Sequence, residues 1–511
     1  MPDRTHRIRK LRCTIATGDR TGAFTLRKNL HDRWQEIFLP VLDRAFEEIG
    51  NDDRTLHIPK LEFRLQIPAD GDLLAILPEI LYRQLREQLR SLDRASLPTS
   101  TANGIAREIT ARQNRFEILL HYLRTGSIPW QVASESASEI SIELRETCQQ
   151  ERSSLLNALE TRSACSSASL PPAPAFYFRW FQLLPETEIV PLLETLAERF
   201  FKLEKAIILQ LIQFILDSPT IPLNNPDRIH LIAEIVALAS RSNSLPSPDL
   251  DTAIDRSLSK TGIDLPAFRT YLPVPVARWL SDRSNPTASL SNNPLETQEI
   301  QPLSHENTIS PQISPSNENR TLDREIGALD RDSPFPPEIP ATETKFPLSV
   351  FHTGLILLHP FLTTLFDAAG ITEPDGIGHR DRAATLLYFL ATGREDLHEY
   401  ELGLIKILLG LEPETPLFSA AGTLREIDRS EAETVLHSAI HYWNVLKNTS
   451  IEGLRSSFLQ RPGLLRKTEN GWLLQIEPRA FDLLLQHLPW SIGIIKLPRM
   501  KSPLYTEWQT F

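Results

Sequence analysis

The sequence predicts a mainly α-helical protein made of several multi-helix segments. Leucine and other apolar residues recur at three- and four-residue steps, the spacing that gives a helix one buried stripe. The 511 residues include 20 Gly and 39 Pro. Glycine is thus about 4% of the chain, against an average of roughly 7%, and proline is nearly 8%, against an average of roughly 5%. The glycine deficit disfavours phosphate loops, nucleotide folds and glycine-punctuated barrels, and the proline excess disfavours one uninterrupted rod-like helix.

Residues 1–134 are expected to form a small strand–helix–strand part followed by a helical module. Alternating apolar residues at 11–15 and 61–67 are typical of half-buried strands. Residues 25–49 between them carry a helical stripe, which Pro40 either kinks or divides into two helices.

Residues 135–280 are expected to be helical segments with Pro-rich joints. Two helices are predicted before this range, at 77–92 and 115–124. Within it, helices are predicted at 176–184, 190–201, 205–216 and 225–238. Most prolines fall between these runs, where a missing N–H costs little.

A linker is predicted at 281–344. Within 281–320, 22 of 40 residues are Ser, Thr, Asn or Pro, and no apolar period is sustained. Such a segment buries too little surface to offset its ordering entropy, so we expect a mostly disordered central linker.

Residues 345–511 are expected to form a C-terminal helical module with a β-hairpin. Helical patterns continue to about residue 461, and the turn residues 469–471, Glu-Asn-Gly, separate two apolar runs. Asn-Gly supplies the positive φ angles of a tight hairpin. The uncharged stretch 346–366 is long enough to span a bilayer, but its two His and two Pro favour a buried core helix broken at Pro360.

A weak internal repeat relates the two helical modules. Residues 115–126, RFEILLHYLRTG, match residues 382–393, RAATLLYFLATG, at six of twelve positions. Each run is an apolar helix stripe ending in a Gly that suits a left-handed cap. The match reflects either a duplicated helical unit or two similar solutions to one capping problem.

Bulk charge and cysteine usage exclude several classes. With 54 basic and 65 acidic residues, the net charge of -11 argues against a general nucleic-acid or anionic-membrane binder. Cys13, Cys148 and Cys165 are odd in number and widely spaced, which disfavours a disulfide framework and indicates a reducing cytoplasm. The basic residues of 1–13 lack a following apolar stretch, so they are not expected to be a secretory signal. Because Leu11, Cys13 and Ile15 alternate, a solvated strand edge fits better than a transit peptide or nucleic-acid arm.

Chemical signatures are sparse, so no catalytic, cofactor-binding or metal residues are predicted. Glu433, His437 and His441 share one helix face and are the best metal candidates, but Ser438 stands where a metalloprotease needs its Glu. The favoured interpretation is that His437 and His441 lie at an interface or are half-buried.

Two groups of side chains suggest other roles. The carboxylates of Glu395, Asp396 and Glu399 follow Gly393 and suit the N-terminus of a next helix. Tryptophans near predicted helix ends or loops are candidate partner-contact residues, with core packing as the alternative. They are Trp130, Trp443, Trp472, Trp490 and Trp508.

An ordered series of motifs resembles the tape-measure protein family of bacterial contractile injection systems, the phage-tail-like particles. The series comprises GLILLHPFL at 354–362, the run 382–393, HYW at 441–443, NTSIEGLR at 448–455, GWLL at 471–474, LPWSI at 488–492, IKLP at 495–498 and PLY at 503–505. The opening strand–helix–strand and RTGSIPW at 124–130 are also similar to that family. The resemblance covers about 6–130 and 346–508.

The resemblance implies a structural, non-enzymatic protein that measures length inside or at the end of the inner tube. It would engage inner tube, baseplate or spike subunits, with self-association in low copy number, and tube growth would stop when the ruler is used up. Bacterial cytoplasm and then the assembled particle are the expected locations, with no nucleic acid and no membrane insertion. The alternative is a cytoplasmic helical scaffold or assembly chaperone that the finished particle does not retain.

Overall fold

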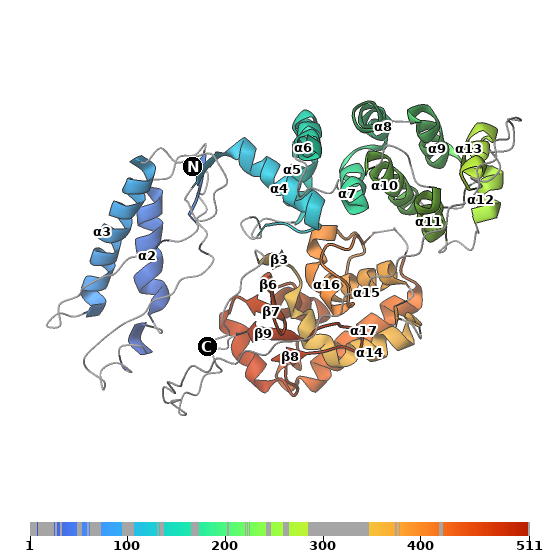
Figure 1. Cartoon of the computed structure of the whole chain (residues 1–511). Coiled ribbons are helices and arrows are strands. Elements are labelled where there is room, and N and C mark those ends of the chain that lie inside the picture. The colour runs from blue at the N-terminus through green and yellow to red at the C-terminus, as the bar shows by residue number, and fades with distance from the viewer. Residues whose placement is uncertain are drawn as a thin grey trace, which may run out of the picture.

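The computed structural model describes residues 33–48, 54–58, 73–94, 107–129, 137–164, 173–201, 204–219, 225–241, 247–258, 265–284, 347–373, 376–377, 379–417 and 423–508, with a few isolated positions besides. These form an N-terminal helix pair, a helical block from α4 to α13, and a C-terminal block of helices around a small sheet (Figure 1). The mainly helical fold class that the sequence predicts is confirmed.

The N-terminal pair consists of α2 (Trp34–Glu47) and α3 (Leu73–Arg94), which pack along each other. Their apolar faces form a core of their own, which includes Phe38 of α2 and Leu85 of α3. Pro40 lies inside α2, so the predicted helix is not divided there.

The strands described near the N-terminus differ from the predicted ones. Residues 11–15 and 62–67 lie outside the described residues, and Leu61 is not in a strand. The described pair is β1 (Arg54–His57) with β2 (Arg107–Thr110), joined antiparallel. Strands of four residues carry too little alternation for a period-two pattern to mark them.

The helical block is built from ten described helices. They are α4 (Ala111–Thr125), α5 (Ala137–Gln150), α6 (Arg152–Ala164), α7 (Pro174–Leu183), α8 (Glu186–Phe200), α9 (Lys205–Asp217), α10 (Asn225–Arg241), α11 (Ser247–Leu258), α12 (Leu265–Tyr271) and α13 (Val274–Ser284). A capping box between Thr110 and Gln113 starts α4. Pro174 opens α7, where its missing N–H is not needed. Pro191 instead lies inside α8, so not every proline marks a joint.

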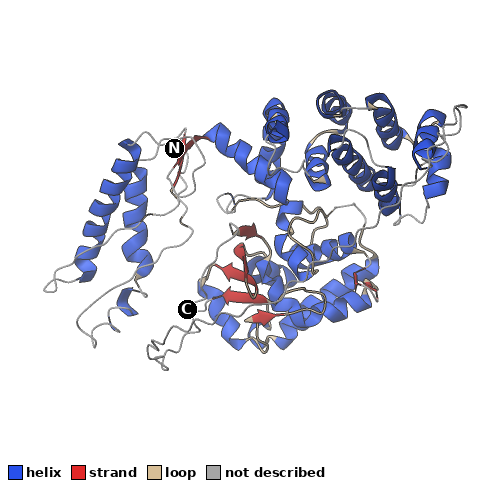
Figure 2. Cartoon of the chain, viewed as in Figure 1, coloured by secondary structure: helices blue, strands red, loops and turns tan. Residues whose placement is uncertain are grey.

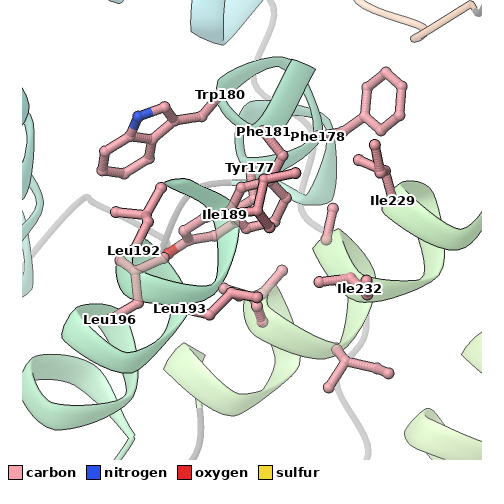
Figure 3. Close-up of a cluster of buried hydrophobic side chains, with 14 of the residues drawn as sticks. Tyr177, Phe178, Trp180, Phe181, Ile189, Leu192, Leu193, Leu196, Ile229 and Ile232 are labelled. Carbon is pink, nitrogen blue, oxygen red and sulfur yellow. The ribbon is translucent and has the colours of Figure 1, made fainter. Parts of the chain in front are cut away.

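One core runs through the helical block, from Leu119 of α4 to Leu280 of α13. Helix α7 is its centre, because residues 176–181 are all buried, as expected of a helix enclosed by others. Figure 3 shows side chains of α7, α8 and α10 pointing toward one another, among them Phe181 and Leu192. This core crosses position 134/135, where the sequence suggests a boundary.

The range predicted as a linker overlaps the end of a helix. Helix α13 continues to Ser284, four residues into the range 281–344. Residues 285–344 lie outside the described residues.

The C-terminal block combines short helices with a five-stranded sheet. Its helical elements are η2 (Thr353–Leu358), α14 (His359–Ala368), α15 (Arg380–Thr392), η3 (Glu399–Glu401), α16 (Gly403–Leu408), α17 (Glu426–Tyr442), η4 (Asn444–Leu446), α18 (Ile451–Leu454), η5 (Arg455–Leu459) and η6 (Ala480–His487). Its strands are β3 (Leu348–Val350), β4 (Thr372–Glu373), β5 (Gly376–Ile377), β6 (Gly463–Thr468), β7 (Gly471–Ile476), β8 (Ile494–Ile495) and β9 (Leu504–Trp508). Strands β3-β6-β7-β9-β8 form the larger sheet in that order, and helices surround it (Figure 2).

The predicted hairpin is confirmed as β6 and β7. Thr468 pairs with Gly471, which leaves Glu469 and Asn470 as the loop. The positive φ, +146°, falls on Gly471 at the start of the second strand and not within the loop. Strand β9 pairs parallel to β7, so the hairpin belongs to a larger sheet than the sequence predicts.

The uncharged stretch 346–366 does not form one long helix. From Leu348 it becomes β3, η2 and then α14, and Pro360 lies in the first turn of α14. The predicted break at Pro360 is therefore a helix start, which suits a residue without an N–H. Across the residues described, no helix is both long and apolar enough for a membrane crossing.

Candidate functional site

A buried ion cluster joins the helical block to the C-terminal block. Arg179 of α7 donates from Nε and Nη2 to the two carboxylate oxygens of Glu399, each at 2.9 Å. Lys406 of α16 donates to the same carboxylate at 2.7 Å. The three side chains are 0%, 6% and 1% exposed, so the whole cluster is removed from water.

Both cations also donate to main-chain carbonyls. Arg179 donates to the carbonyl of Leu123 at 3.1 Å and to that of Glu414 at 2.7 Å. Lys406 donates to the carbonyl of Pro413 at 2.9 Å. Burying charge is costly unless it is paired and hydrogen-bonded, and this cluster meets both conditions.

Burial and ion pairing act in opposite directions on the pKa values. Burial alone would raise the pKa of Glu399, but Lys406 and Arg179 outweigh it and hold that pKa below 4.5. Burial, together with the nearby charge of Arg179, lowers the pKa of Lys406 even though Glu399 acts to raise it. Glu399 is therefore ionised at neutral pH, and its role is to join the blocks through a fixed charge.

Aromatic and main-chain contacts surround the cluster. Tyr400 packs edge-on against Tyr122 of α4 at 6.1 Å and against Phe351 at 6.5 Å, and it belongs to the core of the helical block. Pro129 and Leu348 form an isolated antiparallel bridge between the same two blocks. Figure 1 shows the C-terminal block lying against α4 and α7.

The two halves of the internal repeat end in the same cap. Helix α4 ends at Gly126 with φ +69°, and α15 ends at Gly393 with φ +76°. The preceding Thr125 and Thr392 each donate to the carbonyl four residues back at 2.8 Å. Each Thr hydroxyl also accepts from the N–H two residues ahead, at 3.2 and 3.0 Å. The two runs are thus alike in structure as well as in sequence.

An arginine covers each of these caps. Arg179 binds the carbonyl of Leu123, and Arg455 of η5 binds that of Leu390 at 3.2 Å. Leu123 and Leu390 are the matching positions of the repeat. A guanidinium bound to the last carbonyls satisfies orphan acceptors and suits the negative end of the helix.

The two histidines considered as metal candidates, His437 and His441, are not half-buried, and their lying at an interface stays a prediction. Glu433, His437 and His441 are all exposed on α17. Throughout the described ranges, no group of three or more His, Cys, Asp or Glu is placed to hold a metal ion.

The carboxylates after Gly393 do not cap a helix as expected. Glu395 pairs with Arg429 at 2.7 Å, and Asp396 lies 3.8 Å from Arg394. Glu399 belongs to the ion cluster. Each carboxylate is drawn to a nearby arginine, and a charge pair outweighs the weaker helix dipole.

The five tryptophans have different surroundings. Trp130 lies outside the described residues. Trp443 is 1% exposed and donates to the carbonyl of Leu484, and Trp508 is 9% exposed and donates to the carboxylate of Asp482. Both pack in the core of the C-terminal block, so neither offers its ring to a partner in this structure.

Trp472 and Trp490 differ in exposure. Trp472 is 9% exposed and belongs to the same core as Trp508. Trp472 lines a small pocket of about 190 Å³ with Glu412, Lys467 and Lys501. Trp490 is half-buried and packs edge-on against Phe361 at 5.3 Å. Phe361 stacks in turn on Tyr442, which is 59% exposed. Among the described tryptophans that the sequence singles out, Trp490 is therefore the one with an accessible setting for a partner contact.

The ion cluster was not found from the sequence, although a signal for it exists. Lys406 is the only charge in the apolar run GLIKILLGL, and Arg179 is the only charge in FYFRWF. A lone cation within a buried apolar run needs a buried partner. The sequence cannot show which carboxylate, because Glu399 is 220 positions from Arg179.

Together these features define a helical structural protein whose buried charges hold packed blocks together. The chain belongs to the contractile injection system tape measure protein family, whose family model matches residues 5–508. No curated protein and no solved structure matches it. Proteins of this structural family are part of the particle and contact other components of the injection system.

Proposed function

We propose that this chain is the length-determining and assembly protein of its particle, acting inside or at the end of the inner tube. The observation that carries the proposal is the family match over nearly the whole chain. The two blocks would dock onto inner tube, baseplate or spike subunits after synthesis in the bacterial cytoplasm. In this proposal the chain is present in low copy number in the particle, catalyses no reaction, binds no nucleic acid and does not insert into a membrane.

A measuring role depends on how far the chain can extend. At about 1.5 Å per residue, a wholly helical chain of this length spans on the order of 770 Å. The packed helices do not have this reach while their apolar faces share one core. A ruler therefore requires the Arg179–Glu399 contact to open, with residues 285–344 acting as a spacer between the blocks.

An in-frame deletion tests the spacer. Removing 285–344, about 60 residues, shortens an extended chain by roughly 200 Å at 3.3–3.6 Å per residue. Electron microscopy of assembled particles should show tubes shorter by up to this amount. The matched control replaces the segment with a scrambled sequence of equal length and composition, which should leave the tube length unchanged. An unchanged length in the deletion would contradict the spacer role.

A second candidate is an assembly scaffold or chaperone that is not retained in the particle. The buried ion cluster and the continuous core favour it, because both stabilise a compact state over a drawn-out one. Mass spectrometry of purified particles distinguishes a ruler from an assembly scaffold or chaperone. A ruler is retained in low copy, and a chaperone is missing.

A further inference from the structure

Several apolar side chains are exposed together near the C-terminal end of α17. Tyr442 is 59% exposed and stacks on the half-buried Phe361 of α14, which also packs edge-on against Trp490 at 5.3 Å. Val445 of η4, three positions after Tyr442, is 43% exposed. Leu483 of η6 is 48% exposed, and η4 and η6 are in contact. These five side chains form the apolar face.

The apolar face is held in place by the fold beneath it. The ring N–H of Trp490 donates to the carbonyl of Leu357 at 2.9 Å, and that of the buried Trp443 donates to the carbonyl of Leu484 at 3.1 Å. Single exposed apolar residues are ordinary on a protein surface, whereas several that adjoin one another mark a surface that binds another segment. The apolar face is therefore a preformed surface for such a segment.

The two stretches of chain that carry most of the apolar face are basic on their surface. Lys447 and Arg479 are exposed, and neither has an ion-pair partner within the described part of the chain. Over 441–448 and 479–500 the one acidic residue is Asp482, which is buried and bound to Arg461. An occupant whose apolar residues are flanked by carboxylates would complement this surface in both respects.

Residues 285–346, which lie outside the described residues, have the required composition. They include ten acidic and four basic residues, and so carry -6 of the net charge of -11. Within them, 322–339 reads LDREIGALDRDSPFPPEI, with five acidic and two basic residues, and is the acidic segment below. Its Leu322, Ile326 and Leu329 recur at the four- and three-residue steps that place side chains on one side of a helix.

The acidic segment is close enough along the chain to reach the apolar face. The described structure resumes at Pro347, in the block that carries the face. From Leu329 to Pro347 an extended chain spans up to roughly 60 Å, whereas a compact unit the size of the C-terminal block has a radius of gyration of about 15 Å. A covalent linker of this kind gives an effective concentration in the millimolar range. The chain's own segment therefore has an advantage over a segment of another molecule.

A symmetric dimer through the same surface is disfavoured by charge. In such a dimer each apolar face would meet its copy. Lys447 and Arg479 would then face like charges across the contact, which is unfavourable.

We propose that the acidic segment docks on the apolar face of its own chain. Its apolar residues cover the face, and its carboxylates lie near Lys447 and Arg479. The contact is intramolecular and belongs to the free chain, so it goes beyond the proposed function and does not depend on it.

Site-specific cross-linking in the purified full-length chain tests the contact. A photo-reactive amino acid replaces Val445, and mass spectrometry identifies the cross-linked peptides. The expected product is a monomer in which position 445 is joined to the acidic segment, with a yield that does not change on dilution. The matched control carries the photo-reactive amino acid at Ile427, which is 47% exposed but lies at the other end of α17. It should give no product with the acidic segment.

A first variant removes the apolar part of the contact. Leu322→Ser, Ile326→Ser and Leu329→Ser together should lower the yield from position 445 at least about tenfold, because burying one such side chain already corresponds to about a tenfold change. The three residues lie outside the described blocks. Urea unfolding of the blocks should therefore have the same midpoint as in the wild type.

A charge swap tests the basic part of the contact. Lys447→Glu with Arg479→Glu should lower the yield about fivefold, the change that one exposed ion pair at the strong end of its range represents. Adding Asp330→Lys and Asp332→Lys in the acidic segment should restore much of the yield.

Several outcomes would overturn the docking. They are a product between two copies whose yield rises with protein concentration, a product with a different part of the chain, no product at position 445, an equal yield at Ile427, or a yield that the Leu322, Ile326 and Leu329 variant leaves unchanged. The length-determining function is read separately, from tube length in assembled particles, so the failure of one proposal is distinguishable from the failure of the other.

Discussion

Arg179 of α7 and Glu399 of η3 are 220 positions apart in the sequence, yet their buried side chains share two hydrogen bonds of 2.9 Å. Two parallel bonds between a guanidinium and a carboxylate fix orientation as well as distance. Lys406 adds a third bond to the same carboxylate. The Glu399 carboxylate thus helps to hold the two blocks in one relative position, together with the Tyr400–Tyr122 packing and the Pro129–Leu348 bridge.

Removing the charge of Glu399 should weaken the contact between the two blocks, which is called the joint below. Glu399→Gln leaves Arg179 and Lys406 as buried cations without a counterion, and breaking a buried pair typically costs about 3–5 kcal/mol. Urea unfolding of the full-length chain should show the loss, together with faster limited proteolysis. The control is Arg33→Ala, which removes a pair with Glu36 whose side chains are 55% and 69% exposed; about 0.3–0.5 kcal/mol is expected there. Equal effects of the two variants would contradict the role of the joint.

The joint should also make the fold sensitive to acid. The pKa of Glu399 is lower in the folded chain than the ordinary 4.5, so its stabilising effect is complete above that pH and is lost as the pH falls through the folded value. Thermal unfolding from pH 7 to pH 3 should show the stability gap between wild type and Glu399→Gln closing below about pH 4.5. A gap that stays constant over this range would rule out the linkage.

Three glycines with similar backbone angles should differ in their tolerance of alanine. Gly370 has φ +62° and nothing within 4 Å of an added Cβ, so Gly370→Ala costs only the backbone strain of about 1–2 kcal/mol. Gly393→Ala adds a 2.9 Å contact with Nη1 of Arg455 at a helix end that is exposed. Gly126→Ala would push a methyl group into the Glu399 carboxylate beneath a sealed surface. Chemical denaturation should rank the losses Gly126, then Gly393, then Gly370, and any other order would contradict the contacts described at these three positions.

Two adjacent aromatic residues at the end of α17 should separate stability from surface properties. Trp443 is 1% exposed and packs on Phe458 at 4.9 Å, so Trp443→Ala should cost about 3–5 kcal/mol. Tyr442 is 59% exposed, and Tyr442→Ala should change stability by no more than about 0.5 kcal/mol. The unfolding midpoints of the two variants test this prediction. Shifts of similar size in the two midpoints would contradict it.

Sequence periodicity was sufficient for much of the helical structure. The helix predicted at 205–216 is α9 (Lys205–Asp217), and the apolar run ending in Gly126 is α4 with its left-handed cap. These signals are local, because stripe and cap lie within one stretch of chain. The hairpin was predictable for the same reason.

Features that depend on distant residues were not predictable. Strand β9 has only five residues, and its parallel partner β7 lies beyond a connection that periodicity does not describe. Trp443 looked like a helix-end contact residue, but the packing of η6 buries it. The counterion of Arg179 depends on how two blocks meet, which no single stretch of sequence records.

The joint also sets how the chain tolerates changes in length. Residues 285–346 link Ser284 to Pro347, and the blocks at both ends are already in contact, so this stretch closes a loop. Loop-closure entropy grows only logarithmically, and doubling a loop costs about 0.6 kcal/mol. Insertions or deletions there should hardly disturb the docked blocks. They change the distance between the blocks only after Arg179 has released Glu399.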